Sequence, residues 1–157
     1  MTVYYTIEST VNTWYWNHVA LIRNKIDEFY LILEKVMTEH NNRDERAIAA
    51  MDDFVMSLRD KIYESYRAGV VVDTDTMKTQ FVSPIFNHIP DNYRSTTAEN
   101  TDPDKDFTLL LEKWWNELVI LLTHTNQDLL RTIETETETE TETETAHRVF
   151  PMQHLYI

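Results

Sequence analysis

The side chains in this sequence best suited to bind a metal ion or to move a proton are its histidines and carboxylates. The six histidines stand at His18, His40, His88, His124, His147 and His154. None of them forms the His-x-x-x-His spacing that places two metal ligands on one face of a helix. The sequence therefore predicts no metal site. A metal-dependent hydrolase, assembled from distant histidines and acids on a helical scaffold, stays as one alternative.

The acidic motif most similar to an ion-binding pattern is Asp102-x-Asp104-x-Asp106, which matches the first positions of a calcium-binding loop. Such a loop requires a glycine and, further on, an acid, where this chain has Phe107 and Lys113. We assign the three aspartates instead to the beginning of a helix, where negative charge interacts favourably with the helix dipole.

Nucleophiles and cofactor-binding loops are missing as well. The chain has no cysteine and one glycine, Gly69, so thiolate chemistry and glycine-rich phosphate loops are excluded. No serine stands in a Gly-x-Ser-x-Gly motif. The acids Glu112 and Glu117 are five residues apart, which places them on different faces of a helix. We identify no catalytic or cofactor-binding residue, and the sequence favours a non-enzymatic protein without a cofactor.

The net charge of −13 limits the class of partner. Six glutamates lie in the repeat from Glu134 to Glu144, and the 14 lysines and arginines are scattered along the chain. Binding to a phosphate backbone requires clustered basic residues, so we expect no direct contact with nucleic acid. An acidic inhibitor that imitates nucleic acid toward a basic partner is a second functional alternative.

The sequence contains no segment that predicts contact with a membrane. Its first residues, MTVYYTIESTVN, have neither the basic nor the apolar region of a signal peptide. The most apolar run, 107–122, is shorter than the roughly 20 residues of a membrane span and includes charged residues. We expect a soluble protein in the cytoplasm or elsewhere inside a cell, with a virion as an alternative location.

Apolar residues repeat with helical spacing in three parts of the chain, and they predict a mostly α fold. The alternating spacing of 3 and 4 that is typical of a helix packed along a neighbour runs through Val19, Ile22, Ile26, Phe29, Leu33 and Val36, and again through Ile48, Met51, Val55, Leu58 and Ile62. We predict an antiparallel bundle of three long helices at about 9–40, 42–68 and 102–133. Because the run 107–122 is apolar on most sides, we place the third helix at the centre.

The expected boundaries follow from capping residues. Asn42 is the expected cap of the second helix, Gly69 its left-handed end, and Asp102-Pro103 the beginning of the third. The segment 70–101 lacks periodicity, so we expect an irregular segment packed on the body. The β-branched and aromatic residues 2–7 favour a minor strand, which the apolar C-terminus would pair with.

The chain divides into a single helical domain at 1–133, an acidic Thr/Glu spacer at 134–145 and an apolar C-terminal arm at 146–157. Because a row of like charges opposes strand pairing and also destabilises a helix, we expect the spacer to be extended and solvated. Continuation of the third helix and an edge strand are the alternatives. The arm either folds back on its own body or binds another chain.

The leading functional hypothesis is a non-enzymatic interaction or structural protein that acts through helix faces and the arm. Its partner would be another protein, a second copy of the chain, or both. A small, glycine-poor chain with such a repeat would also suit a virus-encoded accessory or virion component. Tryptophan is enriched at binding hot spots, and the candidate interface residues are Trp14, Trp16, Trp115, Phe150, Leu155 and Tyr156.

Overall fold

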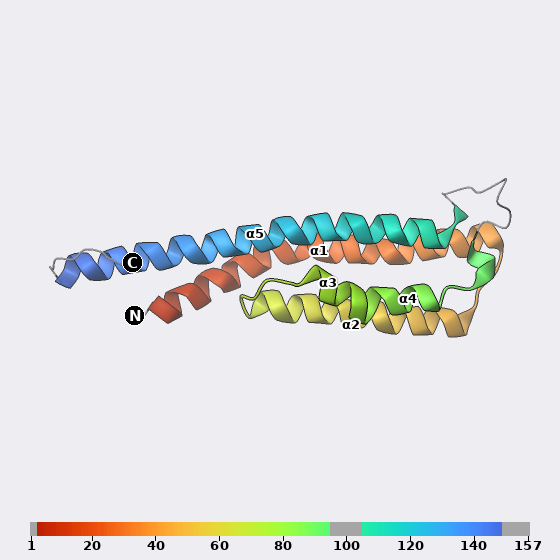
Figure 1. Cartoon of the computed structure of the whole chain (residues 1–157), viewed down its shortest axis with the longest axis horizontal. Helices are drawn as coiled ribbons and strands as arrows, with labels where there is room; N and C mark the ends of the chain where they lie inside the picture. Colours follow the sequence, from red (N-terminus) through yellow and green to blue (C-terminus); the bar gives the residue numbers. More distant parts are fainter. Residues whose placement is uncertain (1–2, 95–104, 149–157) are drawn as a thin grey trace.

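The chain is mostly helical (Figure 1). The computed structural model describes the backbone of residues 3–94 and 105–148, and the side chains of residues 9–94 and 105–135. Its elements in chain order are α1 (Val3–His40), α2 (Glu45–Arg67), α3 (Thr74–Met77), the π-helix η1 (Lys78–Val82), α4 (Ser83–Asn87), the 3-10 helix η2 (Asp91–Tyr93) and α5 (Phe107–Arg148). The described backbone contains no strand. The minor strand expected at residues 2–7 is therefore wrong, because the chain is helical from Val3 onward.

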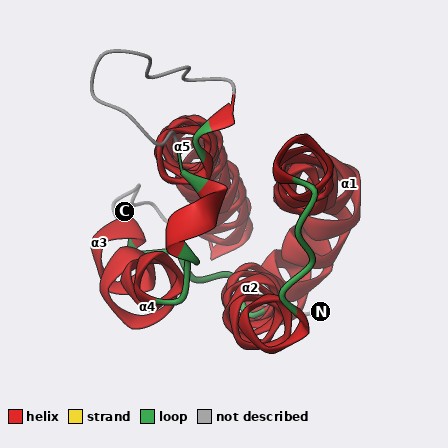
Figure 2. Cartoon of the chain, turned by 90° about the vertical axis from the view of Figure 1, so that its right-hand side faces the viewer, coloured by secondary structure: helices red, strands yellow, loops and turns green. Residues whose placement is uncertain are grey.

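Viewed from one end, the helices occupy four corners (Figure 2). The long helices α1, α2 and α5 take three of them, and the segment from α3 to α4 takes the fourth. Neighbouring corners are in contact through the pairs α1–α5, α1–α2, α2–α4 and α3–α5. The chain reverses direction from each corner to the next, so α1 runs antiparallel to both α2 and α5 (Figure 1).

The heptad residues form the core, as the sequence predicts. All six heptad residues of α1 are buried, and in α2 the buried residues are Met51, Val55, Leu58 and Ile62, with Ile48 partly buried. Gly69 ends the second helix in the left-handed region, with φ of 77°, which also confirms the prediction. The expected cap at Asn42 is wrong by two residues, because the side chain of Asp44 accepts the capping hydrogen bond from the Ala47 N–H.

The segment expected to be irregular contains short helices instead. Residues 74–87 form α3, η1 and α4 in one continuous run, and Met77, Val82 and Ile85 from this run are buried in the core. The π-helix lies directly before Pro84, whose ring would clash with the carbonyl four residues earlier in a regular α-helix. A wider turn at this point accommodates the proline, and no apolar periodicity marks such a helix in the sequence.

Helix α5 occupies a corner of the bundle, so its expected position at the centre is wrong (Figure 2). Trp114, Trp115 and Leu118 are buried, but Ile120 on the outer side is 59% exposed. The helix begins at Phe107, where the Asp106 side chain accepts from the N–H groups of Thr108 and Leu109, whereas 102–104 lie outside the described residues. In the described part of the chain, neither α5 nor another helix combines the length and apolarity that crossing a bilayer requires.

The Thr/Glu repeat continues α5 as far as Arg148, so the expected extended conformation is wrong (Figure 1). Glutamate is a good helix former, and adding a residue to an existing helix avoids the cost of a new nucleus. These two effects act in favour of the helix and against the repulsion between like charges. Of the C-terminal arm, residues 149–157 lie outside the described residues.

A polar clamp fixes the turn after α2 to α5. The Asn126 side-chain amide accepts from the Val72 N–H (2.9 Å) and donates to the Val72 carbonyl (2.8 Å). The Tyr66 hydroxyl donates to the same amide oxygen at 2.7 Å. Burial raises the pKa of Tyr66, so its hydroxyl keeps the proton that it donates. One amide therefore satisfies three groups from another part of the chain.

Replacing Asn126 by alanine should destabilise the fold by about 3 kcal/mol, because each buried group that loses its partner costs roughly 1–3 kcal/mol. Asn116→Ala is the matched control, since Asn116 is exposed on the same helix, and it should change stability by less than about 0.5 kcal/mol. Urea unfolding measures both. Equal stability of the two variants would show that the clamp contributes nothing.

Candidate functional site

Three ion pairs connect α1 to α5 and to Lys105, which lies two residues before α5, along one line that we call the α1–α5 seam. They are His18–Asp128 (3.0 Å), Lys25–Glu117 (3.1 Å) and Glu39–Lys105 (3.6 Å). On α1 their members are seven and fourteen residues apart, so they lie on one stripe beside the buried heptad. In the second pair a positive group of α1 faces a negative group of α5, and in the third the signs are reversed. This pattern favours one register of the two helices.

The central pair is the best connected of the three. The Lys25 ammonium contacts both Glu28 and Glu117 at 3.1 Å, and its backbone carbonyl accepts from the Trp114 indole N–H at 2.8 Å. Partial burial opposes the charge of Lys25, but its hydrogen bonds to the two glutamates and their charges outweigh burial and raise its pKa. The ammonium therefore stays charged at neutral pH.

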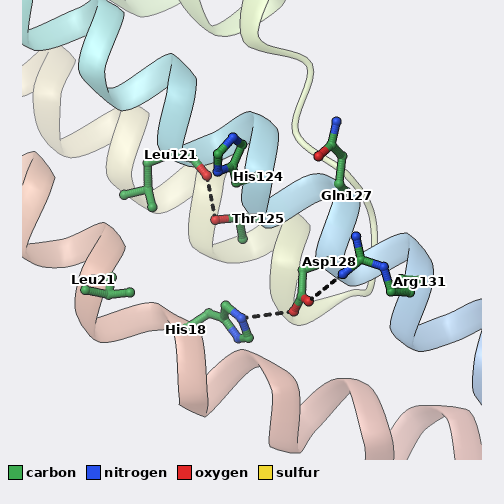
Figure 3. A pocket seen from close by; sticks show the side chains of 8 residues that line it. All are labelled: His18, Leu21, Leu121, His124, Thr125, Gln127, Asp128 and Arg131. Carbon is green, nitrogen blue, oxygen red and sulfur yellow. Dashed lines mark hydrogen bonds and ion pairs between the residues drawn. The ribbon is translucent and has the colours of Figure 1, made fainter.

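At the other end of the seam, Asp128 collects several donors (Figure 3). Its Oδ2 accepts from the Trp14 indole N–H at 2.8 Å and lies 3.0 Å from His18 Nε2. Its Oδ1 lies 3.4 Å from an Arg131 guanidinium nitrogen. The ring of His18 stacks on the indole of Trp14, with 4.7 Å between centroids. One carboxylate thus joins two residues of α1 to α5.

A groove of about 390 Å³ lies between α1 and α5 beside the His18–Asp128 pair (Figure 3). Leu21, which is 60% exposed, lines it from α1, and Leu121, which is partly buried, lines it from α5. Each helix therefore contributes one leucine to the groove. Its remaining lining residues are His18, His124, Thr125, Gln127, Asp128 and Arg131.

The polar groups of this groove are poorly arranged for acid–base or nucleophilic catalysis. Both ring nitrogens of His18 are occupied, because Nδ1 lies 2.8 Å from the Trp14 carbonyl and Nε2 faces Asp128. The hydroxyl of Thr125 donates to the Leu121 carbonyl of its own helix at 2.7 Å. A nucleophile and its base must be within hydrogen-bond reach of each other, and these two groups each bind elsewhere.

The described side chains contain no cluster of three or more histidine and acidic residues that could hold a metal ion. Glu144 and His147, one turn apart on α5, lie beyond the described side chains. A second groove, between α5 and the segment from α3 to α4, is lined by Lys78, Ser83, Phe86, Asn87, Glu112, Trp115 and Asn116. It combines two aromatic rings with exposed polar groups.

The candidate interface residues differ in how exposed they are. Trp14 and Trp115 are each 5% exposed and make their contacts within the chain, whereas Trp16 is 63% exposed. Phe150, Leu155 and Tyr156 lie outside the described residues. Sequence reasoning missed His18, Leu21 and Asp128 as lining residues of one groove. The available signal was the spacing of His18, Lys25 and Glu39 by seven and fourteen residues, because it marks a second stripe beside the heptad.

Reversing one charge of the seam should destabilise the fold, and reversing its partner should restore it. Lys25→Glu places another carboxylate beside Glu28 and Glu117, and we expect a loss of about 1 kcal/mol, since partly exposed pairs contribute little. Adding Glu117→Lys should recover most of that loss. Lys61→Glu, at a pair within α2, is the control. Chemical unfolding of wild type, Lys25→Glu, Glu117→Lys and the double variant gives the coupling, and additive effects would disprove the pairing.

Comparison of the chain with protein-family models, with curated proteins and with solved structures gave no match. The roles of the residues in the α1–α5 seam therefore follow from their contacts.

Proposed function

We propose that this chain is a non-enzymatic interaction protein that associates with a second copy of itself. The observation that supports this best is the groove of the α1–α5 seam, where Leu21 is 60% exposed beside Leu121. At this groove, His18 and Asp128 already contact each other and Trp14 of α1. The hydroxyl of Thr125 donates to a backbone carbonyl of its own helix, α5. The groove therefore offers apolar area and shape rather than a reactive group, which suits binding.

The C-terminal arm of a second copy is the occupant that we propose for this groove. Helix α5 carries the arm away from the groove, because Arg148 lies roughly 30 Å beyond Asp128 at about 1.5 Å per residue. The nine residues 149–157 span at most about 30 Å when fully extended. An arm that folds back would reach only the near end of its own groove. The length of the arm does not restrict binding to the groove of another copy in this way.

The composition of the arm fits an apolar groove. Residues 149–157 read VFPMQHLYI and contain no acid, and Phe150, Leu155 and Tyr156 are large apolar or aromatic side chains. Aromatic anchors that enter a pocket supply most of the energy of many interfaces. The acidic repeats of two copies repel each other, so salt should leave the association unchanged or strengthen it.

Deleting residues 149–157 should convert the protein to a monomer, and Leu21→Glu should do the same by placing a charge in the groove. Leu31→Glu is the matched control, because Leu31 is 71% exposed on the same helix and does not line the groove. Light scattering over a range of protein concentrations measures the mass. A wild-type monomer at all concentrations would contradict self-association, and equal effects at Leu21 and Leu31 would contradict this groove.

A second candidate function is an acidic inhibitor of a basic, nucleic-acid-binding protein, and the helical conformation of the repeat favours it. Glutamate occupies every second position from Glu134 to Glu144, so the helix carries one negative charge per roughly 3 Å of its axis, on alternating sides. A single nucleic-acid strand carries one charge per roughly 3.4 Å. An extended chain would double the spacing to about 6.7 Å.

Poly-L-lysine is a suitable basic probe for this second function. Wild-type protein should bind it tightly at low salt and lose affinity as salt rises, because the attraction between charges is screened. Thr139→Pro should weaken binding while it keeps all six glutamates, since proline breaks a helix interior. Titration calorimetry at two salt concentrations measures both proteins. Equal affinity of the variant would show that charge spacing along a helix is irrelevant.

A further inference from the structure

The ring of His18 lies between two hydrogen-bond acceptors. Its Nδ1 is 2.8 Å from the backbone carbonyl of Trp14, and its Nε2 is 3.0 Å from Oδ2 of Asp128. A neutral imidazole has one N–H and one lone pair, whereas the imidazolium has two N–H donors. In either neutral tautomer, a nitrogen lone pair faces an oxygen at about 3 Å, which is repulsive. The ring with two protons satisfies both acceptors.

The surroundings of His18 also favour a positive ring. On one side it stacks on the Trp14 indole at 4.7 Å with an interplanar angle of 24°, a geometry in which a cation interacts favourably with the ring. On the other side it faces the Asp128 carboxylate.

The remaining groups near this ring come from α5 and α2. Arg131 opposes a positive ring, but it lies against the other oxygen of Asp128 and its side chain is 70% exposed. His124 lines the same groove without an ion pair in the described part of the chain. From α2, Tyr66 contacts the edge of Trp14 at 5.4 Å and keeps its proton because burial raises its pKa.

We infer that the His18–Asp128 contact is a proton-dependent latch between α1 and α5, which is closed while the His18 ring carries two protons. Histidine rings change charge between about pH 5 and 8. Only the doubly protonated ring can donate to both the Trp14 carbonyl and the Asp128 carboxylate. The latch therefore adds to the free energy of unfolding at the acidic end of this range, and its contribution is lost as the pH rises.

The latch lies at the end of the core, so its opening affects the packing there. Trp14 and His18 lie level with the end of α2, and beyond this level α1 and α5 diverge toward their free ends (Figure 1). Val11 and Leu129 are buried at this end of the core. Loss of the proton removes one of the contacts that hold α1 against α5 there, so the N-terminal part of α1 can move away from α5 and uncover these side chains.

The direct test is nuclear magnetic resonance on the intact chain between pH 5 and pH 8. The ¹⁵N shifts of the His18 ring report how many protons it carries, and the indole N–H signal of Trp14, assigned with Trp14→Phe, reports its bond to Asp128. We expect a doubly protonated ring at pH 5, and a shift of the Trp14 signal in step with the loss of the proton. A neutral ring at pH 5, or a Trp14 signal that ignores the titration, would overturn the latch.

Stability gives a second and independent readout. His18→Gln should lower the urea midpoint clearly at pH 5 and little at pH 8, because the glutamine amide cannot take up the proton. His124→Gln is the matched control and should leave the midpoint unchanged at both pH values. An equal effect of His18→Gln at the two pH values would assign His18 a packing role and contradict the latch. If His18→Gln does not fold, the resonance experiment on wild-type protein still decides the question.

Discussion

The packing of α1 against α5 is the interaction on which the other contacts of this molecule depend. It joins the two ends of the sequence, and its centre is aromatic: Phe29 of α1 lies 5.5 Å from Trp114 and 5.8 Å from Phe107 between ring centroids. Complete burial of a large apolar side chain contributes roughly 1.5–3 kcal/mol. This contact closes the longest loop in the chain, while α2 packs on α1 and the segment from α3 to α4 packs on α2 and α5.

Polar side chains around this contact mainly determine how α1 and α5 are aligned. The ion pairs of the α1–α5 seam favour one register, and the Trp114 indole donates to the backbone of α1 at Lys25. On the opposite side of α5, Asn126 holds the turn at Val72. Several histidine, aspartate and tyrosine side chains bind within the chain: His18 pairs with Asp128, and the Tyr66 hydroxyl donates to Asn126.

The three long helices differ in length. Helices α1 and α5 have 38 and 42 residues, whereas α2 has 23, so the two long helices continue beyond the end of the shorter one (Figure 1). The groove lined by Leu21 and the His18–Asp128 contact both lie on the α1–α5 pair. Binding at the groove and the protonation of His18 would therefore act on the same pair of helices.

The heptads of α1 and α2 were predictable, because a buried stripe requires apolar residues at periodic positions. This period is visible in the sequence whichever element covers the stripe. The turn at Gly69 was predictable for a similar reason, since the left-handed backbone favours glycine locally. The short helices at 74–87 were not, because their residues pack as a fourth corner without a regular period. The helical repeat was also missed, since local repulsion between glutamates was given more weight than continuation of an existing helix.

The sequence by itself determined which stripes of α1 and α2 are buried, because water excludes apolar side chains wherever the chain goes. It also determined the acidic charge and the lack of nucleophile and cofactor motifs. Tertiary structure alone decided that Trp114 and Trp115, which point about 100° apart on one helix, are both buried, because a corner helix has neighbours on two sides. It also decided that His18 meets Asp128 across 110 residues, since only the register of α1 on α5 brings the two side chains together.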